Sequence, residues 1–162
     1  MTTSPHDPLT LDVFLDWERE QTLRCEFDGA RAIAMTGGSV EYSVIATNLV
    51  RALQDRLRGR PCRAFHGDLK ILVAARVRYP DALVTSTPVP RGSDFVLDPV
   101  SVFEVVSPTT ASTERIAATA FTREGGDRIG RMLAGPADLA LPELGVALAL
   151  AELYRDVELA EA

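Results

Sequence analysis

One apolar run, residues 100–106, contains a single charged side chain, Glu104. Its length and composition predict a strand. An ionised carboxylate inside such a strand costs several kcal/mol unless it is paired, protonated or bound to a metal. The fold therefore has to supply a partner for Glu104, and this residue becomes a candidate for a functional site.

A second carboxylate, Asp81, stands at the start of another strand-like run, residues 79–84, just after Pro80 has set the chain in an extended conformation. Two carboxylates at the ends of neighbouring strands can bind a hard divalent cation such as Mg²⁺ or Mn²⁺ through oxygen ligands. The metal would activate a water molecule and stabilise charge on a phosphodiester oxygen. The residues alone also allow a simpler interpretation, in which Asp81 caps a turn and Glu104 pairs with an arginine.

Secondary structure is predicted from apolar periodicity and from the residues that cap or break it. Helices are expected over residues 10–20, 40–57 and 150–154, with Thr10 as the first cap. Strands are expected over residues 24–27, 30–35, 63–66, 68–74, 79–84, 100–106, 116–122 and 128–133. Asp28-Gly29 predicts a two-residue hairpin turn, residues 75–78 a tight connection, and the proline-rich residues 85–99 a loop.

The length of 162 residues fits a single domain, residues 1–162. No apolar run approaches the roughly 20 residues that cross a bilayer, and the N-terminus lacks the basic start of a signal peptide. We therefore expect a cytoplasmic protein without a membrane span, in which Cys25 and Cys62 are buried thiols. A net charge of −6 argues against nonspecific coating of nucleic acid but allows a nuclease, whose metal site must be acidic.

Longer motifs carry a family resemblance. The sequence contains YPD before an apolar strand, a proline-rich loop and then DPVSVFEVVSP. TLDVFLDWE, RCEFDGARAIAM, GGSVEYSVIATNLVRAL and GDLKILV precede them, and LPELGVALALAELY closes the chain. In this order they resemble the Uma-two family of restriction endonuclease-like proteins, part of the PD-(D/E)XK nuclease superfamily. The resemblance covers nearly the whole chain.

The resemblance implies an α/β fold with a restriction-endonuclease-like core, in which helices flank a central mixed β-sheet. It also implies a magnesium-dependent DNA endonuclease. Asp81 and Glu104 match the two acids of the family motif and would be the metal ligands. Glu26 matches a third acid that would orient the metal or the water, with an exposed turn-flanking acid as the alternative. Asp68 matches another common acid, or is a solvated strand residue.

The chain departs from the superfamily at the catalytic lysine. Val106 stands two residues after the second acid, where the textual motif has lysine. In the family the lysine lies on a helix after the SPTT-like turn, but here residues 107–113 run almost directly into ERIAATAFTREGG. One helix and one strand of the family pattern are therefore expected to be missing. Lys70 is the only lysine among the 17 Lys and Arg residues, so it is the remaining candidate for the catalytic cation, or a solvated strand lysine.

Two weaker signals remain. Tyr42 stands where the family usually has a histidine, which counts against a general base at this position. Five arginines near the end of the long helix could contact a phosphate backbone or form a solvated face, namely Arg51, Arg56, Arg58, Arg60 and Arg63.

Three functions stay open on this sequence. The retained acids favour a DNA endonuclease, with activity weakened or lost along with the lysine segment. The gap favours a non-catalytic nuclease-fold module that binds nucleic acid or a partner, or a damaged gene product. A missing helix would also expose apolar surface, from which we expect either self-association, such as a homodimer, or low stability.

Overall fold

The computed structural model describes residues 9–105, 117–124, 127–134 and 138–157. The helices of this part are α1 (Leu11–Glu18), α2 (Val40–Arg56) and α3 (Leu150–Leu153). Its strands are β1 (Cys25–Phe27), β2 (Ala32–Ala34), β3 (Arg63–His66), β4 (Lys70–Val73), β5 (Arg76–Arg78), β6 (Ala82–Thr85), β7 (Phe95–Val96), β8 (Ser101–Val105), β9 (Ala117–Glu124), β10 (Asp127–Ala134), β11 (Asp138–Leu141) and β12 (Val146–Ala149). Within these ranges, no helix is long and apolar enough to cross a membrane.

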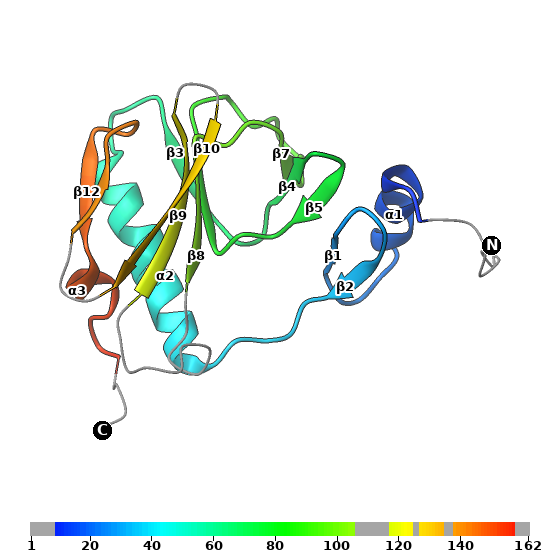
Figure 1. Ribbon diagram of the computed structural model, residues 1–162, viewed down its shortest axis with the longest axis horizontal. Helices are drawn as coiled ribbons and strands as arrows, with labels where there is room; N and C mark the ends of the chain where they lie inside the picture. The colour runs from blue at the N-terminus through cyan, green and yellow to red at the C-terminus, as the bar shows by residue number, and fades with distance from the viewer. Residues whose placement is uncertain (1–8, 106–116, 125–126, 135–137, 158–162) are drawn as a thin grey trace.

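The strands form two large sheets and one small one. The first sheet has the order β2-β1-β5-β4-β7, the second has the order β10-β9-β8-β6-β3, and β11 pairs with β12 in the third. β4 and β7 are parallel, with Lys70 opposite Phe95, so the first sheet is mixed. Figure 1 shows the first sheet and α1 at one end of the molecule, and the second sheet with α2 at the other. The predicted α/β class with a mixed sheet is confirmed, with the strands divided between two large sheets.

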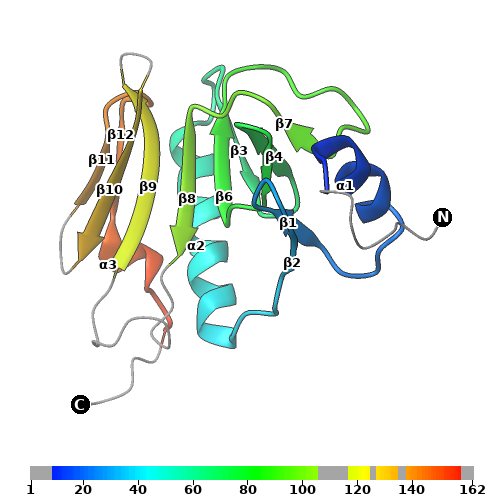
Figure 2. The ribbon, with the colours of Figure 1, turned by 45° about the vertical axis from the view of Figure 1, so that its right-hand side comes forward.

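The long helix α2 forms where its apolar periodicity predicts it. Ser39 caps the helix by accepting a hydrogen bond from the N–H of Tyr42 at 3.2 Å. Leu49 and Leu53 are almost fully buried against the second sheet, and each contributes about 1.5–3 kcal/mol on the usual transfer scale. Figure 2 shows α2 running behind β3, β6 and β8. The helix therefore closes the outer face of the strands that carry Asp81 and Glu104.

Besides the main core around α2, two smaller apolar clusters pack against the first sheet. Phe14 of α1 stacks on Phe27 of β1, with ring centroids 5.0 Å apart, and Cys25 is buried beside them. Cys25 is therefore the buried thiol that was predicted, while Cys62 is half-buried, and both are free. A third cluster lies between the two large sheets, made by Ile71, Leu83, Val96 and Val102.

The first hairpin, β1 with β2, turns one residue later than predicted. The N–H of Asp28 donates to the carbonyl of Arg31 at 3.2 Å, so the tip is Gly29-Ala30 rather than Asp28-Gly29. Only Gly29 of these residues has a positive φ, +100°. Asp28 instead accepts hydrogen bonds from the N–H groups of Ala30 and Arg31, both at 2.8 Å. The Asp-Gly pair therefore marked a turn correctly and misplaced its tip.

The sequence analysis predicted only a tight connection over residues 75–78. In the structure, Arg76–Arg78 forms the strand β5. The turn before it is centred on Ala74 and Ala75, whose φ angles are +48° and +57°. These angles suit a two-residue hairpin between β4 and β5. The predicted loop over residues 85–99 also contains the short strand β7.

The chain after β8 is described only in part. The strands predicted over residues 116–122 and 128–133 correspond to β9 and β10, which pair as a hairpin in a register that places Glu124 opposite Asp127. The third sheet was not predicted. Residues 107–113, where a helix and a strand of the family pattern are expected to be missing, lie outside the described residues, as does Val106. The homodimer expected from this gap stays a prediction.

Candidate functional site

The structure brings Asp81 and Glu104 together across two neighbouring strands. β6 pairs with β8 in a register that places Ala82 opposite Phe103. Asp81 immediately precedes β6, and extending this antiparallel register by one position places it opposite Glu104. Residues directly opposite each other point to the same side of a sheet. Two carboxylates therefore share one side of the second sheet.

Asp81 is held by two donors from different parts of the chain. The hydroxyl of Tyr42, in the first turn of α2, donates to Oδ1 of Asp81. The backbone N–H of Val105, next to Glu104 on β8, donates to Oδ2. The loop after β3 also approaches closely, because a Cβ on Gly67 would lie 2.9 Å from the carbonyl oxygen of Pro80. The Asp81 carboxylate thus has a fixed orientation.

The surroundings make it costly to ionise both acids. Burial raises the pKa of Asp81, and the hydrogen bonds from Tyr42 and Val105 oppose that rise. Burial, together with the negative charges of Asp81 and Glu26, raises the pKa of Glu104 from 4.5 to about 8. Among the described residues, the Glu104 side chain has no hydrogen bond. An acid pair of this kind would gain from a nearby cation.

Glu26 approaches the same acids from the first sheet. Its Oε2 accepts a hydrogen bond from Nη1 of Arg78 at 2.9 Å, and its Oε1 accepts one from the N–H of Tyr79 at 2.9 Å. Its charge acts on both Asp81 and Glu104, so it lies within electrostatic reach of them. The structure therefore places Glu26 near the two acids in an ion pair with Arg78, and not as an exposed turn residue.

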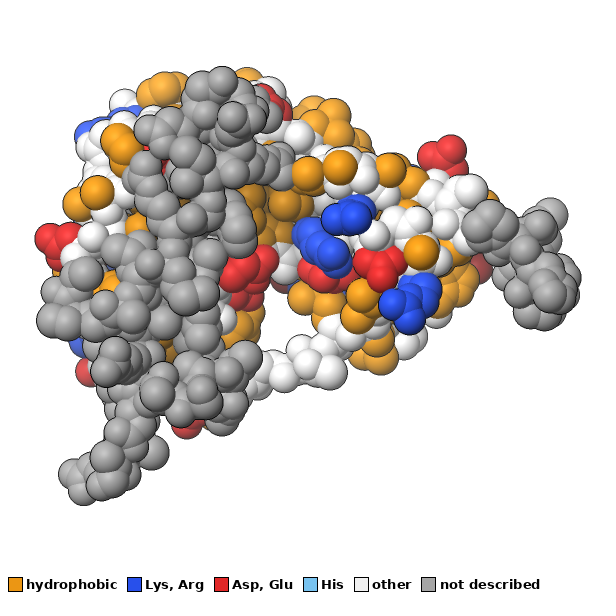
Figure 3. Space-filling view, viewed as in Figure 1, with side chains coloured by type: hydrophobic (Ala, Val, Ile, Leu, Met, Phe, Trp, Pro, Cys, Tyr) orange, Lys and Arg blue, Asp and Glu red, His pale blue; other side chains and the backbone are white. Residues whose placement is uncertain are grey.

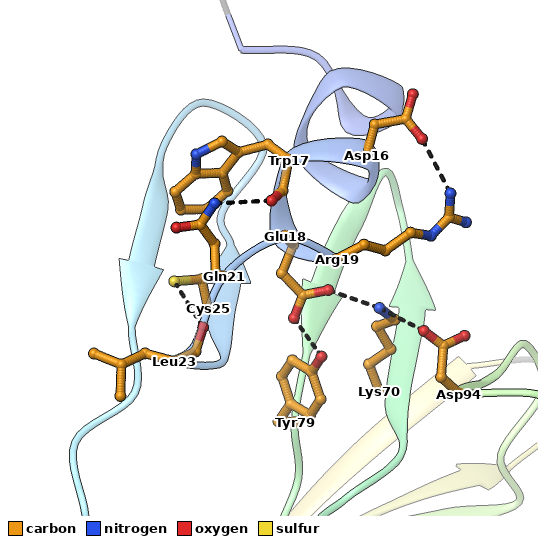
Figure 4. A network of polar contacts seen from close by, with 10 residues as sticks. All are labelled: Asp16, Trp17, Glu18, Arg19, Gln21, Leu23, Cys25, Lys70, Tyr79 and Asp94. Carbon is orange, nitrogen blue, oxygen red and sulfur yellow. Dashed lines mark hydrogen bonds and ion pairs between the residues drawn. The ribbon is translucent and has the colours of Figure 1, made fainter.

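Lys70 lies elsewhere, in a buried network between α1 and the first sheet (Figure 4). Its ammonium contacts Oε2 of Glu18 at 2.7 Å and Oδ2 of Asp94 at 2.9 Å. The hydroxyl of Tyr79 donates to the other oxygen of Glu18 at 2.5 Å. Burial alone would lower the pKa of Lys70, but the bonds to Glu18 and Asp94 outweigh burial and raise it. Lys70 is 4% exposed, so the solvated alternative is also wrong.

The predicted role of Lys70 as the cation of the acid site is therefore corrected. Alternation along β4 turns its side chain away from Ile71, which packs toward the second sheet, and so toward α1. On that side, Glu18 of α1 forms the ion pair with Lys70. A signal for this partner exists in α1, because Glu18 lies four residues after Phe14 and so falls on the buried face of the helix.

The other predicted charges are mostly engaged in surface pairs. Asp68 pairs with Arg24 at 2.8 Å, with both side chains more than half exposed. Three of the five clustered arginines bind protein acceptors: Arg56 pairs with Glu152, Arg58 with Asp55, and Arg60 with the carbonyls of Leu144 and Gly145. These three arginines therefore have partners within the protein.

The carboxylates of Asp81 and Glu104 suit Mg²⁺ better than they suit a metal ion that needs three or more protein ligands. No group of three or more His, Cys, Asp or Glu side chains in the described part of the chain could hold a metal ion. Mg²⁺ usually keeps several waters and needs only one or two carboxylates from the protein. Asp81 and Glu104 supply two carboxylates side by side, and a divalent cation would relieve their mutual repulsion.

Gly38 provides the space in which Tyr42 reaches Asp81. A Cβ on Gly38 would clash with the ring of Tyr42, whereas a Cβ on Gly37 would meet nothing within 4 Å. We expect Gly38→Ala to lower the free energy of unfolding by about 1–3 kcal/mol, because the ring must move away from Asp81.

Gly37→Ala is the matched control for this prediction and is expected to change stability by less than about 0.5 kcal/mol. Urea unfolding of both variants measures the difference. Equal stabilities of the two variants would show that Tyr42 does not depend on Gly38.

The chain matches a family model, a curated protein and a solved structure. The model of the Uma-two (Uma2) family, described as "Putative restriction endonuclease", matches residues 11–126. "Uncharacterized protein slr1290" of Synechocystis sp. is 34% identical over 116 residues, which are 70% of this chain and 61% of that protein. The chain thus spans less than two thirds of this curated relative.

A crystal structure described as "a putative nuclease belonging to DUF820", from Anabaena variabilis, matches with a TM-score of 0.69 and 18% identity. The match covers 91% of this chain and 98% of that chain. It confirms the predicted nuclease-like α/β fold.

Proposed function

Because the chain belongs to the Uma-two family of restriction endonuclease-like proteins, we propose that it hydrolyses phosphodiester bonds of DNA with the help of Mg²⁺ or Mn²⁺. The observation that carries this proposal is the juxtaposition of Asp81 and Glu104 across β6 and β8. Both carboxylates have a raised pKa, and both favour a cation beside them. The family and the shared fold support the nuclease class.

Each residue of the site has a role that its contacts support. Asp81 and Glu104 would hold the metal, which when bound supplies Lewis-acid stabilisation and a more acidic water. Tyr42 and the N–H of Val105 orient Asp81, so that its carboxylate is already placed before a ligand arrives. Glu26 lies near enough to influence both acids and would orient the attacking water through a hydrogen bond.

Cleavage of supercoiled plasmid and of single-stranded DNA, with Mg²⁺ or Mn²⁺, tests this function. We expect the unaltered chain to cleave slowly, and Asp81→Asn and Glu104→Gln to lose at least a factor of about 100 in rate, because each removes a metal ligand. Calorimetric titration should show that Mg²⁺ binding is lost in both variants.

Asp68→Asn is the matched control, since it also removes one carboxylate but from an exposed surface pair. It is expected to leave the cleavage rate within about twofold, as surface pairs contribute little. Equal Mg²⁺ affinity in the unaltered chain and in Asp81→Asn would contradict the proposed metal site.

A second function, a non-catalytic module that binds nucleic acid, is favoured by one observation. Lys70, the only lysine, forms ion pairs with Glu18 and Asp94 and does not serve the acid site. Binding of DNA without any cleavage in Mg²⁺ or Mn²⁺ would support this second function over the first.

A further inference from the structure

The two large sheets face each other, and their facing sides define which residues share the space between them. Ile71 of the first sheet packs with Leu83 and Val102 of the second in the cluster between the sheets. Arg78 lies opposite Ile71 in the pairing of β4 with β5, so it points to the same side of the first sheet.

The two acids point into the same space from the other sheet. Asp81 is two residues from Leu83 on the chain, and Glu104 is two residues from Val102. Since side chains two apart on a strand share a face, both acids lie on the side of the second sheet that faces the first. Arg78 and the acid pair therefore border one space, beside the apolar cluster.

Electrostatics agrees with this placement. The positive charge of Arg78 lowers the pKa of Glu104, opposing burial and the neighbouring acids. Figure 3 shows the molecule hollowed between its two ends, with acidic side chains on one wall and both acidic and basic side chains on the other.

Arg78 is held in place but keeps donors to spare. Its neighbours Val77 and Tyr79 are buried, and Tyr79 is fixed by its hydroxyl to Glu18 and by its N–H to Glu26. A guanidinium has five N–H donors, and Glu26 takes one of them. The side chain of Arg78 is 36% exposed, so a ligand in the hollow can reach the remaining donors.

From this arrangement we propose that Arg78 is the residue that binds the phosphate of the nucleic-acid substrate. This inference rests on the proposed function and deepens it. Three acids border the site and would repel a polyanion, so a cation facing them is needed for a phosphodiester to enter. The planar guanidinium binds two phosphate oxygens at once while staying charged, which suits charge stabilisation and not proton transfer.

The test is the affinity of a fluorescent single-stranded oligonucleotide, measured by anisotropy at several salt concentrations with Ca²⁺ in place of Mg²⁺. Arg78→Gln is expected to weaken binding about tenfold and to reduce the slope of log affinity against log salt by about 0.7, the value for one lost phosphate contact on a single strand. Arg78→Lys should keep most of the slope and part of the affinity.

Arg76→Gln is the matched control, because Arg76 lies two residues away on the same strand and face, and its loss changes the net charge equally. It should leave the slope unchanged. Glu26→Gln tests whether Arg78 contacts the phosphate directly or acts only through its ion pair with Glu26. The variant breaks this ion pair and also removes a negative charge near the phosphate. We expect it to bind the oligonucleotide at least as tightly as the unaltered chain.

Equal slopes for Arg78→Gln and the unaltered chain would overturn the inference, and so would equal losses in Arg76→Gln and Arg78→Gln. Weakened oligonucleotide binding in Glu26→Gln would show that Arg78 acts only through its ion pair with Glu26. Absence of oligonucleotide binding by the unaltered chain would also overturn the inference. Because cleavage is not the readout, the proposed reaction can fail in the Mg²⁺ assay while the phosphate contact of Arg78 is still confirmed.

Discussion

Lys70→Met is expected to lower the free energy of unfolding by about 3–5 kcal/mol, the range for removing one partner of a buried ion pair. The side chains of Lys70 and Glu18 are 5% and 6% exposed, so water cannot replace the lost ammonium. Glu18 would keep only the hydroxyl of Tyr79 as a donor among its described contacts. The methionine fills most of the space, so the loss reports on charge rather than on a cavity.

Two controls isolate this effect in urea unfolding. Arg24→Met removes the cation of the exposed pair with Asp68 and should cost less than about 1 kcal/mol. The double variant Glu18→Leu with Lys70→Met removes both charges and should recover most of the stability, because a buried ion pair can be replaced by apolar side chains at little cost. A loss in Lys70→Met no larger than in Arg24→Met would contradict the buried pair.

Local features of the sequence predicted what depends on local physics. Thr10 was expected to cap the first helix, and its hydroxyl accepts from the N–H of Val13 at 3.4 Å. The apolar stripe of α2 was expected from its spacing, and it is buried. Asp81 and Glu104 were expected on neighbouring strands because one metal ion would need both carboxylates. The register that pairs Ala82 with Phe103 extends by one position to place these two acids opposite each other.

Pairing between distant segments could not be read from such features. Alternation along β4 places the side chain of Lys70 on the face opposite to Ile71, but the sequence did not show that α1 covers that face. Arg76–Arg78 is short and charged, so no periodicity marked it as a strand, and the pairing of Glu26 with Arg78 follows only from its register. Tyr42 reaches an aspartate 39 residues away through the start of α2.

The stability of the chain without metal is expected to fall as the pH rises from 5 to 8. Burial and the charges of Asp81 and Glu26 raise the folded-state pKa of Glu104 from 4.5 to about 8. Between these two values the folded protein keeps a proton that the unfolded chain releases, so the folded state binds more protons and stability decreases with pH. At about 1.4 kcal/mol per pKa unit, the loss amounts to a few kcal/mol.

Glu104→Gln tests the assignment, because an amide has nearly the same shape and no proton to lose. The variant should lose most of the decrease between pH 5 and pH 8, and at pH 8 it should be more stable than the unaltered chain by a few kcal/mol. Carboxylates with a lowered pKa, such as Asp94 and Glu152, lose their contribution at pH values below this window and do not mask it.

Mg²⁺ should act on the unaltered chain in the opposite direction to rising pH. A cation between Asp81 and Glu104 favours their ionised forms, so saturating Mg²⁺ should raise stability at pH 8 and have little effect at pH 5, where Glu104 holds its proton. Glu104→Gln should gain nothing from Mg²⁺ at either pH. Urea unfolding at both pH values, with Mg²⁺ and with EDTA, measures all of these differences. If stability rises from pH 5 to pH 8 in EDTA, Glu104 is ionised at neutral pH without a metal, and the argument that this acid pair needs a cation fails.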